Sequence, residues 1–181
     1  MIRFRLPVLV LALVLLAGCG FHLRNRIALP SDLGPVRVVG ASTSYSALVT
    51  SLSRGLQAAG ATLAAPPGED AATAADAQVA TLRIMSERWG DLPIAVDQFG
   101  RAQEFSLRYA VVFAFTKADG TDLVPQQVVE LSRDYVSPPQ DATGTTTERE
   151  VLAEELRREM AASILRRVDG VVRSSPVNAA P

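Results

Sequence analysis

The stretch EFSLRYAVVFAF, residues 104–115, is the clearest strand in the chain, because apolar and more polar side chains alternate along its whole length. A period of two is typical of a β-strand that turns one strongly apolar face to a core and a milder face away from it. The large apolar side chains of the core face are Phe105, Leu107, Tyr109, Val111, Phe113 and Phe115. The sequence therefore predicts a sheet with one buried face.

A second strand follows this one after a short turn. Asp119-Gly120 supplies the turn chemistry of a hairpin, since glycine accepts a positive φ at no steric cost. The return strand is predicted over residues 126–136, and its apolar face carries Val129, Leu131 and Tyr135. Arg133 interrupts that face, which marks an edge of the sheet, a bulge or a functional point.

Two further strands are predicted before this hairpin. Residues 36–40 read as a short strand that ends at a glycine, and residues 78–87 regain strand character. Residues 61–65 could add a short strand. The stretch from Trp89 to Pro93 is expected to break the strand, with a connection running from there to about Ala102.

One helix is predicted in each half of the chain. The first starts near Tyr45, with an N-cap offered by residues 42–44, and ends at Gly60. The second has capping-box spacing from Thr145 and Thr147 and a plausible end at Gly170. The apolar stripe of the first helix, at steps of three and four, consists of Tyr45, Leu48, Val49, Leu52 and Leu56. The stripe of the second, at steps of four, consists of Leu152, Leu156, Met160, Ile164 and Val168.

These elements predict an α+β fold. It is a two-layer sandwich in which two amphipathic helices cover one face of a mostly antiparallel four-stranded sheet. The single α+β domain is expected to span residues 36–172, and residues 173–181 are expected to form a flexible tail.

The N-terminus predicts export. Arg3 and Arg5 precede an apolar run over residues 6–16 that is too short to span a bilayer, so residues 1–18 read as a signal peptide that is removed. The run ends in Leu-Ala-Gly-Cys, which resembles the bacterial lipobox. This resemblance implies cleavage between Gly18 and Cys19 and acylation of Cys19, leaving residues 19–35 as a lipidated leader. The alternative is a plain signal peptide that contains a cysteine.

The composition excludes several classes of protein. With 48% hydrophobic and 20% charged residues the chain can bury a core, and a net charge of −1 argues against a general nucleic-acid binder. His22 is the single histidine and Cys19 the single cysteine, which leaves no set of zinc ligands. Without a phosphate loop or a nucleophile elbow, the chain is expected not to be an enzyme and to need no cofactor or metal.

Basic side chains on the milder strand faces and nearby loops are the candidate binding residues. An arginine can hold a phosphate through two hydrogen bonds, so a few of them could contact an anionic glycolipid or an acidic partner. The alternative is that they only keep the sheet soluble and blunt its edges. The candidates are Arg83, Arg101, Arg108, Lys117 and Arg133, with Arg88 among the same group.

The motif Gly-Cys-Gly-Phe-His-Leu-Arg at residues 18–24, followed by this order of strands and helices, resembles the lipopolysaccharide-assembly lipoprotein family LptE, also called RlpB. The resemblance implies an outer-membrane lipoprotein that forms a heterodimer with the β-barrel LptD, plugs it, helps it assemble and assists delivery of lipopolysaccharide to the outer leaflet. Gly20 after the acylated cysteine favours the outer membrane by resemblance to the Gram-negative sorting rule. Basic residues implicated in lipopolysaccharide contact in the family align near Gln98 and Thr145, neither of which is basic.

Two other classes of function stay open at this point. One is a generic lipoprotein binding module that presents its sheet to another envelope protein. The other is a membrane-tethered hydrolase that uses carboxylates, which would need a cleft with clustered acidic groups of perturbed pKa.

Overall fold

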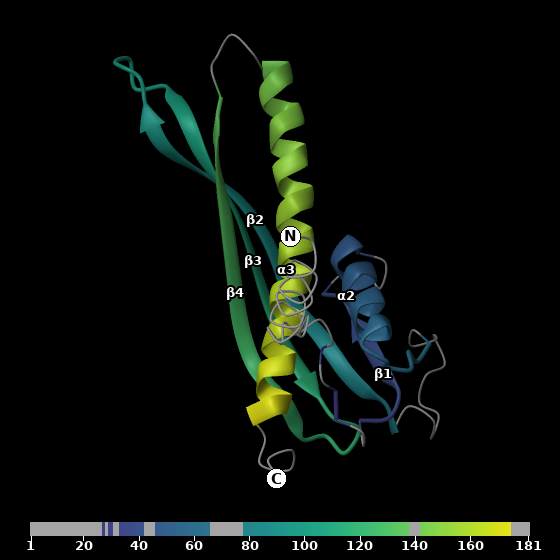
Figure 1. Ribbon diagram of the computed structural model, residues 1–181. Coiled ribbons are helices and arrows are strands. Elements are labelled where there is room, and N and C mark those ends of the chain that lie inside the picture. Colours follow the sequence, from purple (N-terminus) through teal and green to yellow (C-terminus); the bar gives the residue numbers. More distant parts are fainter. Residues whose placement is uncertain are drawn as a thin grey trace, which may run out of the picture.

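Figure 1 shows a computed structural model of the protein, which describes residues 27, 29–30, 33–41, 46–65, 78–137 and 142–174. The signal peptide, Gly18, Cys19 and His22 lie outside these residues, as do most of the leader and tail. The elements, in chain order, are β1 (Val36–Val39), α2 (Ala47–Ala58), β2 (Ala80–Val96), β3 (Ala102–Thr116), β4 (Asp122–Val136) and α3 (Ala142–Ser174).

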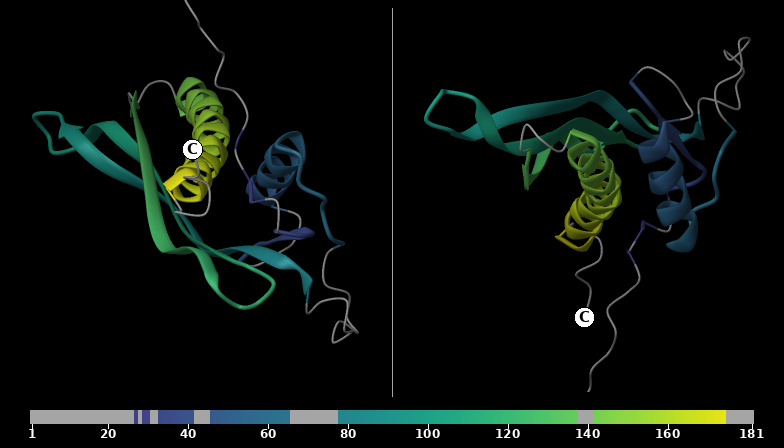
Figure 2. Two further views of the ribbon diagram at one scale, coloured as in Figure 1. Left: turned by 60° about the horizontal axis from the view of Figure 1, so that its bottom comes forward. Right: turned by 90° about the horizontal axis from the view of Figure 1, so that it is seen from above.

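The four strands form one sheet in the order β1-β2-β3-β4. The short β1 runs parallel to the start of β2, and the three long strands are antiparallel to one another. Both helices lie on the same side of this sheet, with α3 along the long strands and α2 beside β1 (Figure 2). The predicted two-layer α+β fold is confirmed.

The core lies between the sheet and the helices. The alternate residues of β3 that face the helices are buried from Leu107 to Phe115, as the period of two predicts. Burying each aliphatic or aromatic side chain of this size contributes about 1.5–3 kcal/mol. The helices add to this core Leu48, Leu52, Leu56, Leu156, Met160, Ile164 and Val168, which are all fully buried.

Strand β2 is longer than predicted. It does not break at Trp89 but runs on to Val96, and residues 89–93 pair with residues 105–109 of β3. Because β1 pairs only with residues 80–83, this part of β2 has no neighbour on its other side among the strands that the structure describes. Gly90 and Pro93 are tolerated there, since proline within sheets is found on edge strands.

The start of α2 and both ends of α3 differ from the predictions, whereas Gly60, with a φ of 98°, directly follows the C-cap of α2 as predicted. The N-cap of α2 is Ser46, whose Oγ accepts a hydrogen bond from the backbone N–H of Val49 at 3.1 Å. Helix α3 begins at Ala142, so the predicted caps at Thr145 and Thr147 lie within it, and it continues past Gly170 to Ser174.

Packing explains why glycine does not end α3. Val172, two residues beyond Gly170, is buried and extends the apolar stripe, so tertiary contacts outweigh the low helix propensity of glycine. The possible strand at residues 61–65 is reduced to a single bridge between Val36 and Leu63. Among the described residues, no helix combines the length and the hydropathy that crossing a membrane requires.

Candidate functional site

The far end of the β2–β3 hairpin is the most distinctive exposed feature of the described chain. In Figure 1 it projects past the helices at the upper left. Its turn closes with two backbone bonds, from the N–H of Asp97 to the carbonyl of Arg101 and from the N–H of Gly100 to the carbonyl of Asp97, both 2.9 Å. Gly100 has a φ of 76°, a conformation that favours glycine.

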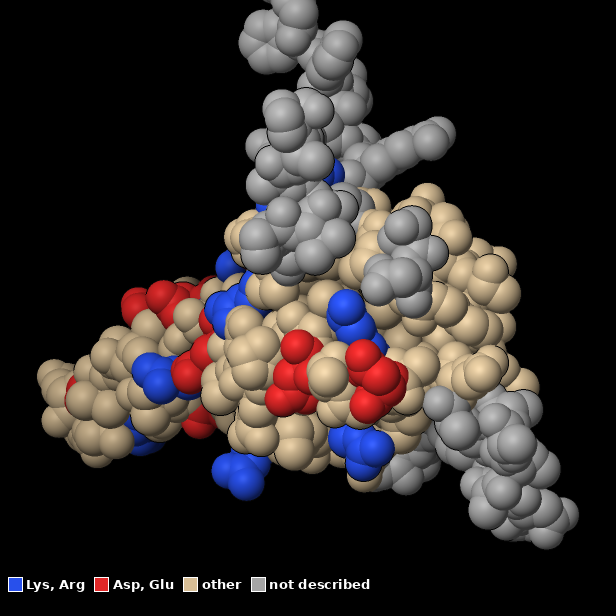
Figure 3. Space-filling model, turned by 90° about the horizontal axis from the view of Figure 1, so that it is seen from below, with Lys and Arg blue, Asp and Glu red and all other residues tan. Residues whose placement is uncertain are grey.

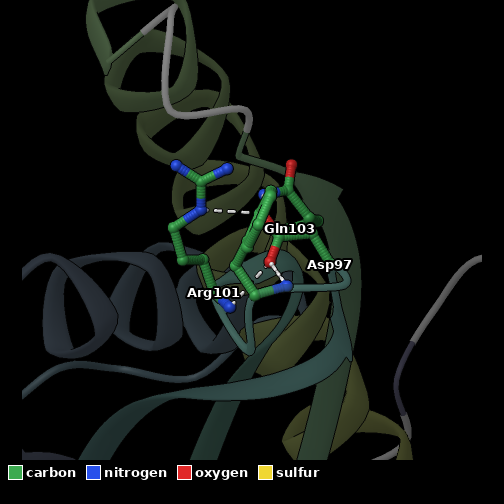
Figure 4. A network of polar contacts seen from close by, with 4 residues as sticks. Asp97, Arg101 and Gln103 are labelled. Atoms are coloured by element: carbon green, nitrogen blue, oxygen red, sulfur yellow. Dashed lines mark hydrogen bonds and ion pairs between the residues drawn. The ribbon is translucent and has the colours of Figure 1, made fainter.

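The Asp97 carboxylate stabilises the turn by accepting hydrogen bonds from the residues that follow it (Figure 4). It accepts hydrogen bonds from the backbone N–H groups of Phe99 at 2.8 Å and Arg101 at 3.0 Å, from Arg101 Nε at 2.7 Å and from Gln103 Nε2 at 3.3 Å. These donors, first the Arg101 backbone N–H, lower the pKa of Asp97 below its usual value. The network therefore fixes the turn while the carboxylate is ionised.

Apolar side chains gather around this fixed turn. Phe99 is 72% exposed, and the Arg101 guanidinium carbon lies 5.2 Å from the centre of its ring. The end of the hairpin forms the largely uncharged lobe at the far left of Figure 3. Such a cluster marks a binding surface more often than scattered single residues do. Its other exposed members are Leu92, Ile94, Val96 and, from the adjoining end of β4, Val136.

A polar cluster ties α3 to the strands just behind this tip. Arg149 of α3 donates from Nε to Asp91 Oδ1 at 2.9 Å and from Nη2 to Asp91 Oδ2 at 2.8 Å. The hydroxyl of Tyr135 donates to the same Oδ1 at 3.0 Å. The hydrogen bond from Arg149 lowers the pKa of Asp91, and burial followed by the Asp91 contact raises that of Tyr135.

A second polar cluster lies further along the same helix. Arg133 Nη2 is 2.6 Å from Glu159 Oε2 and 3.5 Å from Glu155 Oε1, both on α3. This resolves why an arginine interrupts the apolar face of β4: its charge is neutralised by the helix that covers it.

An aromatic pair packs below these contacts. The rings of Trp89 and Tyr109 stack with centroids 3.8 Å apart, and the guanidinium carbon of Arg157 lies 5.2 Å from the centre of the indole. The buried Tyr109 hydroxyl donates to Glu87 Oε1 at 2.7 Å. Burial, followed by this contact, raises the pKa of Tyr109.

The five predicted binding residues do not form one site. Arg101 lies at the tip, and Lys117 begins the other hairpin turn, which closes with the same backbone bonds. Arg83 and Arg108 pair with β3 and β2 residues on the sheet face away from the helices, and Arg133 lies beneath α3. Of the two family-aligned positions, Gln98 is in the tip turn and Thr145 is near the start of α3.

The sequence patterns did not predict the apolar tip or the Asp91 cluster. Both omissions result from the strand break that was expected at residues 89–93, because this break placed the tip in an irregular connection. A signal was present, because Gly100 occupies the same place in this turn as Gly120 in the second hairpin, and both have a positive φ. Among the described residues, no group of three or more histidine, cysteine or acidic side chains could hold a metal ion.

Comparison with known protein families gives a match over most of the described chain. The family described as "LptE: Lipopolysaccharide-assembly" matches residues 33–168. The chain is 27% identical over 168 residues to "LPS-assembly lipoprotein LptE" of Photorhabdus laumondii, covering 92% of this chain and 86% of that protein. It is 30% identical to the protein of the same name from Yersinia pestis (strain Pestoides F), covering 92% and 76%.

Solved structures resemble the fold. An NMR structure of an uncharacterized lipoprotein B from Nitrosomonas europaea aligns with a TM-score of 0.66 and 19% identity, covering 88% of this chain and 97% of that one. The crystal structure of the rare lipoprotein B from Shewanella oneidensis gives 0.58 and 23%, covering 79% and 97%. At these identities the likeness supports the arrangement of strands and helices alone.

Proposed function

Because the chain belongs to the LptE family of lipopolysaccharide-assembly lipoproteins, we propose that it acts in the outer membrane as the plug and assembly partner of the β-barrel LptD. In that position it assists delivery of lipopolysaccharide to the outer leaflet. The observation that carries the proposal is the family match, which extends from just before β1 into the last turns of α3. The proposed role is one of binding and contains no catalytic step.

The shape and surface of the domain suit a plug. The lumen of an outer-membrane barrel is polar, so a protein inside it needs its own core and a charged exterior. This domain buries its apolar residues between sheet and helices, and on the face in Figure 3 the basic and acidic side chains are interspersed. An acylated Cys19 would hold the plug at the membrane and raise its effective concentration near the barrel.

The hairpin tip suits contact with lipopolysaccharide. This ligand carries phosphate groups on a sugar backbone and several acyl chains, so a site for it needs cationic and apolar groups side by side. Arg101 supplies the cation and Phe99 the most exposed apolar surface, and Asp97 holds both in place. Because this site is small, we expect LptD to make the other contacts with lipopolysaccharide.

The test of the partner is a mild-detergent purification of the full-length lipidated protein from outer membranes, with every co-purifying chain identified. A large β-barrel in equal amount is the expected result. If the protein is lipidated and folded but brings down another envelope protein instead, it is a generic binding module and the LptD proposal is wrong.

The test of the ligand compares charge reversals of the same kind. Arg101→Glu should weaken binding of purified lipopolysaccharide without lowering the melting temperature, and Arg108→Glu tests the nearest candidate on the sheet face. Arg158→Glu, at an exposed position on α3, is the matched control. Equal binding by the Arg101 variant and the control would remove the tip from the proposal.

A further inference from the structure

The outer side of β2 has no neighbouring strand along most of its length among the residues that the structure describes. Strand β1 pairs with residues 80–83 alone, and Figure 1 shows β1 and α2 beside the lower half of the sheet. We refer to residues 87–93 on this side of β2 as the open edge. At about 3.4 Å per residue it is roughly 24 Å long, which is enough room for a strand of ordinary length.

The open edge turns alternate backbone groups away from the sheet. Pro93 pairs with Phe105 of β3 although proline has no N–H to donate, so its nitrogen faces away from β3. Backbone groups alternate between the two sides of a strand, so the N–H and C=O groups of Glu87, Trp89 and Asp91 also face away. These groups make no hydrogen bond within the described residues, and they are therefore available to a further strand.

The opposite edge of the sheet, on β4, is blocked. Arg167 of α3 donates from Nη1 to the carbonyl of Val128 at 2.9 Å, and Arg133 donates from Nη1 to the carbonyl of Ser132 at 3.0 Å. These arginine side chains occupy carbonyl groups that a strand pairing with β4 would need. A further strand can thus join the sheet at β2 more readily than at β4.

The side chains of the open edge indicate what such a strand would carry. Arg88, Gly90 and Leu92 lie on the sheet face away from the helices, because they alternate with Trp89, which stacks on the buried Tyr109. Arg88 is exposed and makes no ion pair within the described residues. A Cβ atom at Gly90 would meet no atom within 4 Å, which leaves space for a large side chain of a neighbouring strand. Leu92 adds an exposed apolar surface.

We propose that the open edge binds an extended segment of a partner polypeptide, which joins the sheet antiparallel to β2. From its N-terminus, this segment has an apolar residue beside Leu92, an aromatic residue beside Gly90 and a carboxylate beside Arg88. The residues between these three lie beside Asp91 and Trp89 and exchange backbone hydrogen bonds with them. Backbone pairing supplies the affinity, and the carboxylate and the apolar residues supply the specificity.

A different polypeptide fits the open edge better than a second copy of this chain does. On the face away from the helices the open edge carries Arg88, Gly90 and Leu92, so two copies paired through it would give Arg88 no carboxylate. The register that places Arg88 beside Gly90 would also bring Glu87 beside Asp91, which are like charges. This inference concerns the edge of β2 and does not depend on the proposed function.

Synthetic peptides test the proposal, because Trp89 is the single tryptophan of the chain and its fluorescence reports on the open edge. The probe is a peptide of about nine residues in which threonine alternates with valine, phenylalanine and glutamate in that order. Added to the full-length lipidated protein in detergent, it should change the Trp89 emission and saturate below millimolar concentration. Replacing its glutamate by lysine should weaken binding by about tenfold.

A charge exchange in the protein should reverse this preference. Arg88→Glu should bind the lysine peptide more tightly than the glutamate peptide, whereas the matched control Arg54→Glu, at an exposed position on α2, should behave like the wild type. Melting curves should show that both variants fold. An Arg88→Glu variant that still prefers the glutamate peptide would overturn the proposal.

Backbone methylation separates strand pairing from a contact between charges alone. N-methylation of the two threonines that lie beside Trp89 and Asp91 removes the N–H groups facing β2, so it should abolish binding. N-methylation of the valine and phenylalanine, whose N–H groups face away, is the control and should leave binding intact. Equal binding by the two methylated peptides, or no saturable change in emission with any peptide, would show that the open edge does not accept a strand.

Discussion

The cluster of Asp91, Tyr135 and Arg149 is expected to hold the N-terminal part of α3 against the sheet. Arg149 binds the carboxylate through two nitrogens, a geometry stronger than a single contact. The side chains of Arg149 and Asp91 are 37% and 31% exposed, so solvent screening reduces the value expected for a buried pair. We expect Asp91→Asn or Arg149→Gln to cost about 1–2 kcal/mol each.

Thermal unfolding followed by circular dichroism provides the assay. A loss of 1 kcal/mol lowers the melting temperature by about 2–4 °C in a domain of this size. The double variant should lose less than the sum of the single variants, because both remove the same interaction. Arg158→Gln, on the same helix at an exposed position, is the control and should leave the melting temperature unchanged.

The same cluster predicts a dependence on pH. Its Asp91 pKa is lowered in the folded protein, so the stabilisation is fully present above the ordinary carboxyl value of 3.8. It is lost as the pH falls through the lower folded value, and the difference between wild type and Asp91→Asn should shrink in that acidic window. Additive losses, or a difference that does not change with pH, would show that the contact between Asp91 and Arg149 does not stabilise the fold.

Four other substitutions test the packing and the tip. Gly55→Ala places a methyl group against the buried side chain of Leu165, so it should lower the free energy of unfolding in urea by about 1–3 kcal/mol. Gly170→Ala adds its methyl group in open space within a helix, so it should raise the free energy of unfolding by about 0.5–1 kcal/mol. Met160→Ala, in the centre of the core, should cost about 2–5 kcal/mol by the same measurement. Asp97→Ala should loosen the hairpin turn, seen as faster proteolysis at the tip than in wild type; unchanged cleavage would contradict the role of its carboxylate.

Local periodicity was enough to predict the elements that form the core. The alternating residues 104–115 lie in β3, and the apolar stripe from Leu152 to Val168 lies in α3. Both patterns could be recognised because burial on one face selects apolar residues at those spacings. The covering of one sheet face by two helices follows from the same patterns. The order of the long strands in the sheet is also predictable, since β2, β3 and β4 are consecutive in the chain and pair as neighbours.

Features set by long-range contacts could not be predicted in this way. Trp89 and Pro93 look like the end of a strand, but the pairing of β2 with β3 continues through them. Gly170 looks like the end of a helix, but the burial of Val172 keeps it helical. The ion pairs of Asp91 and Arg133 join residues far apart in the sequence, so neither partner can be named from its local pattern.

The proposed role of this lipoprotein in assembling lipopolysaccharide at the cell surface can be tested on intact cells. The most direct measurement is the amount of lipopolysaccharide that a membrane-impermeant probe labels on intact cells while the protein is depleted. Surface labelling should fall as the protein is lost and return when the full-length wild-type chain is supplied. Labelling that stays constant through complete depletion would contradict that role.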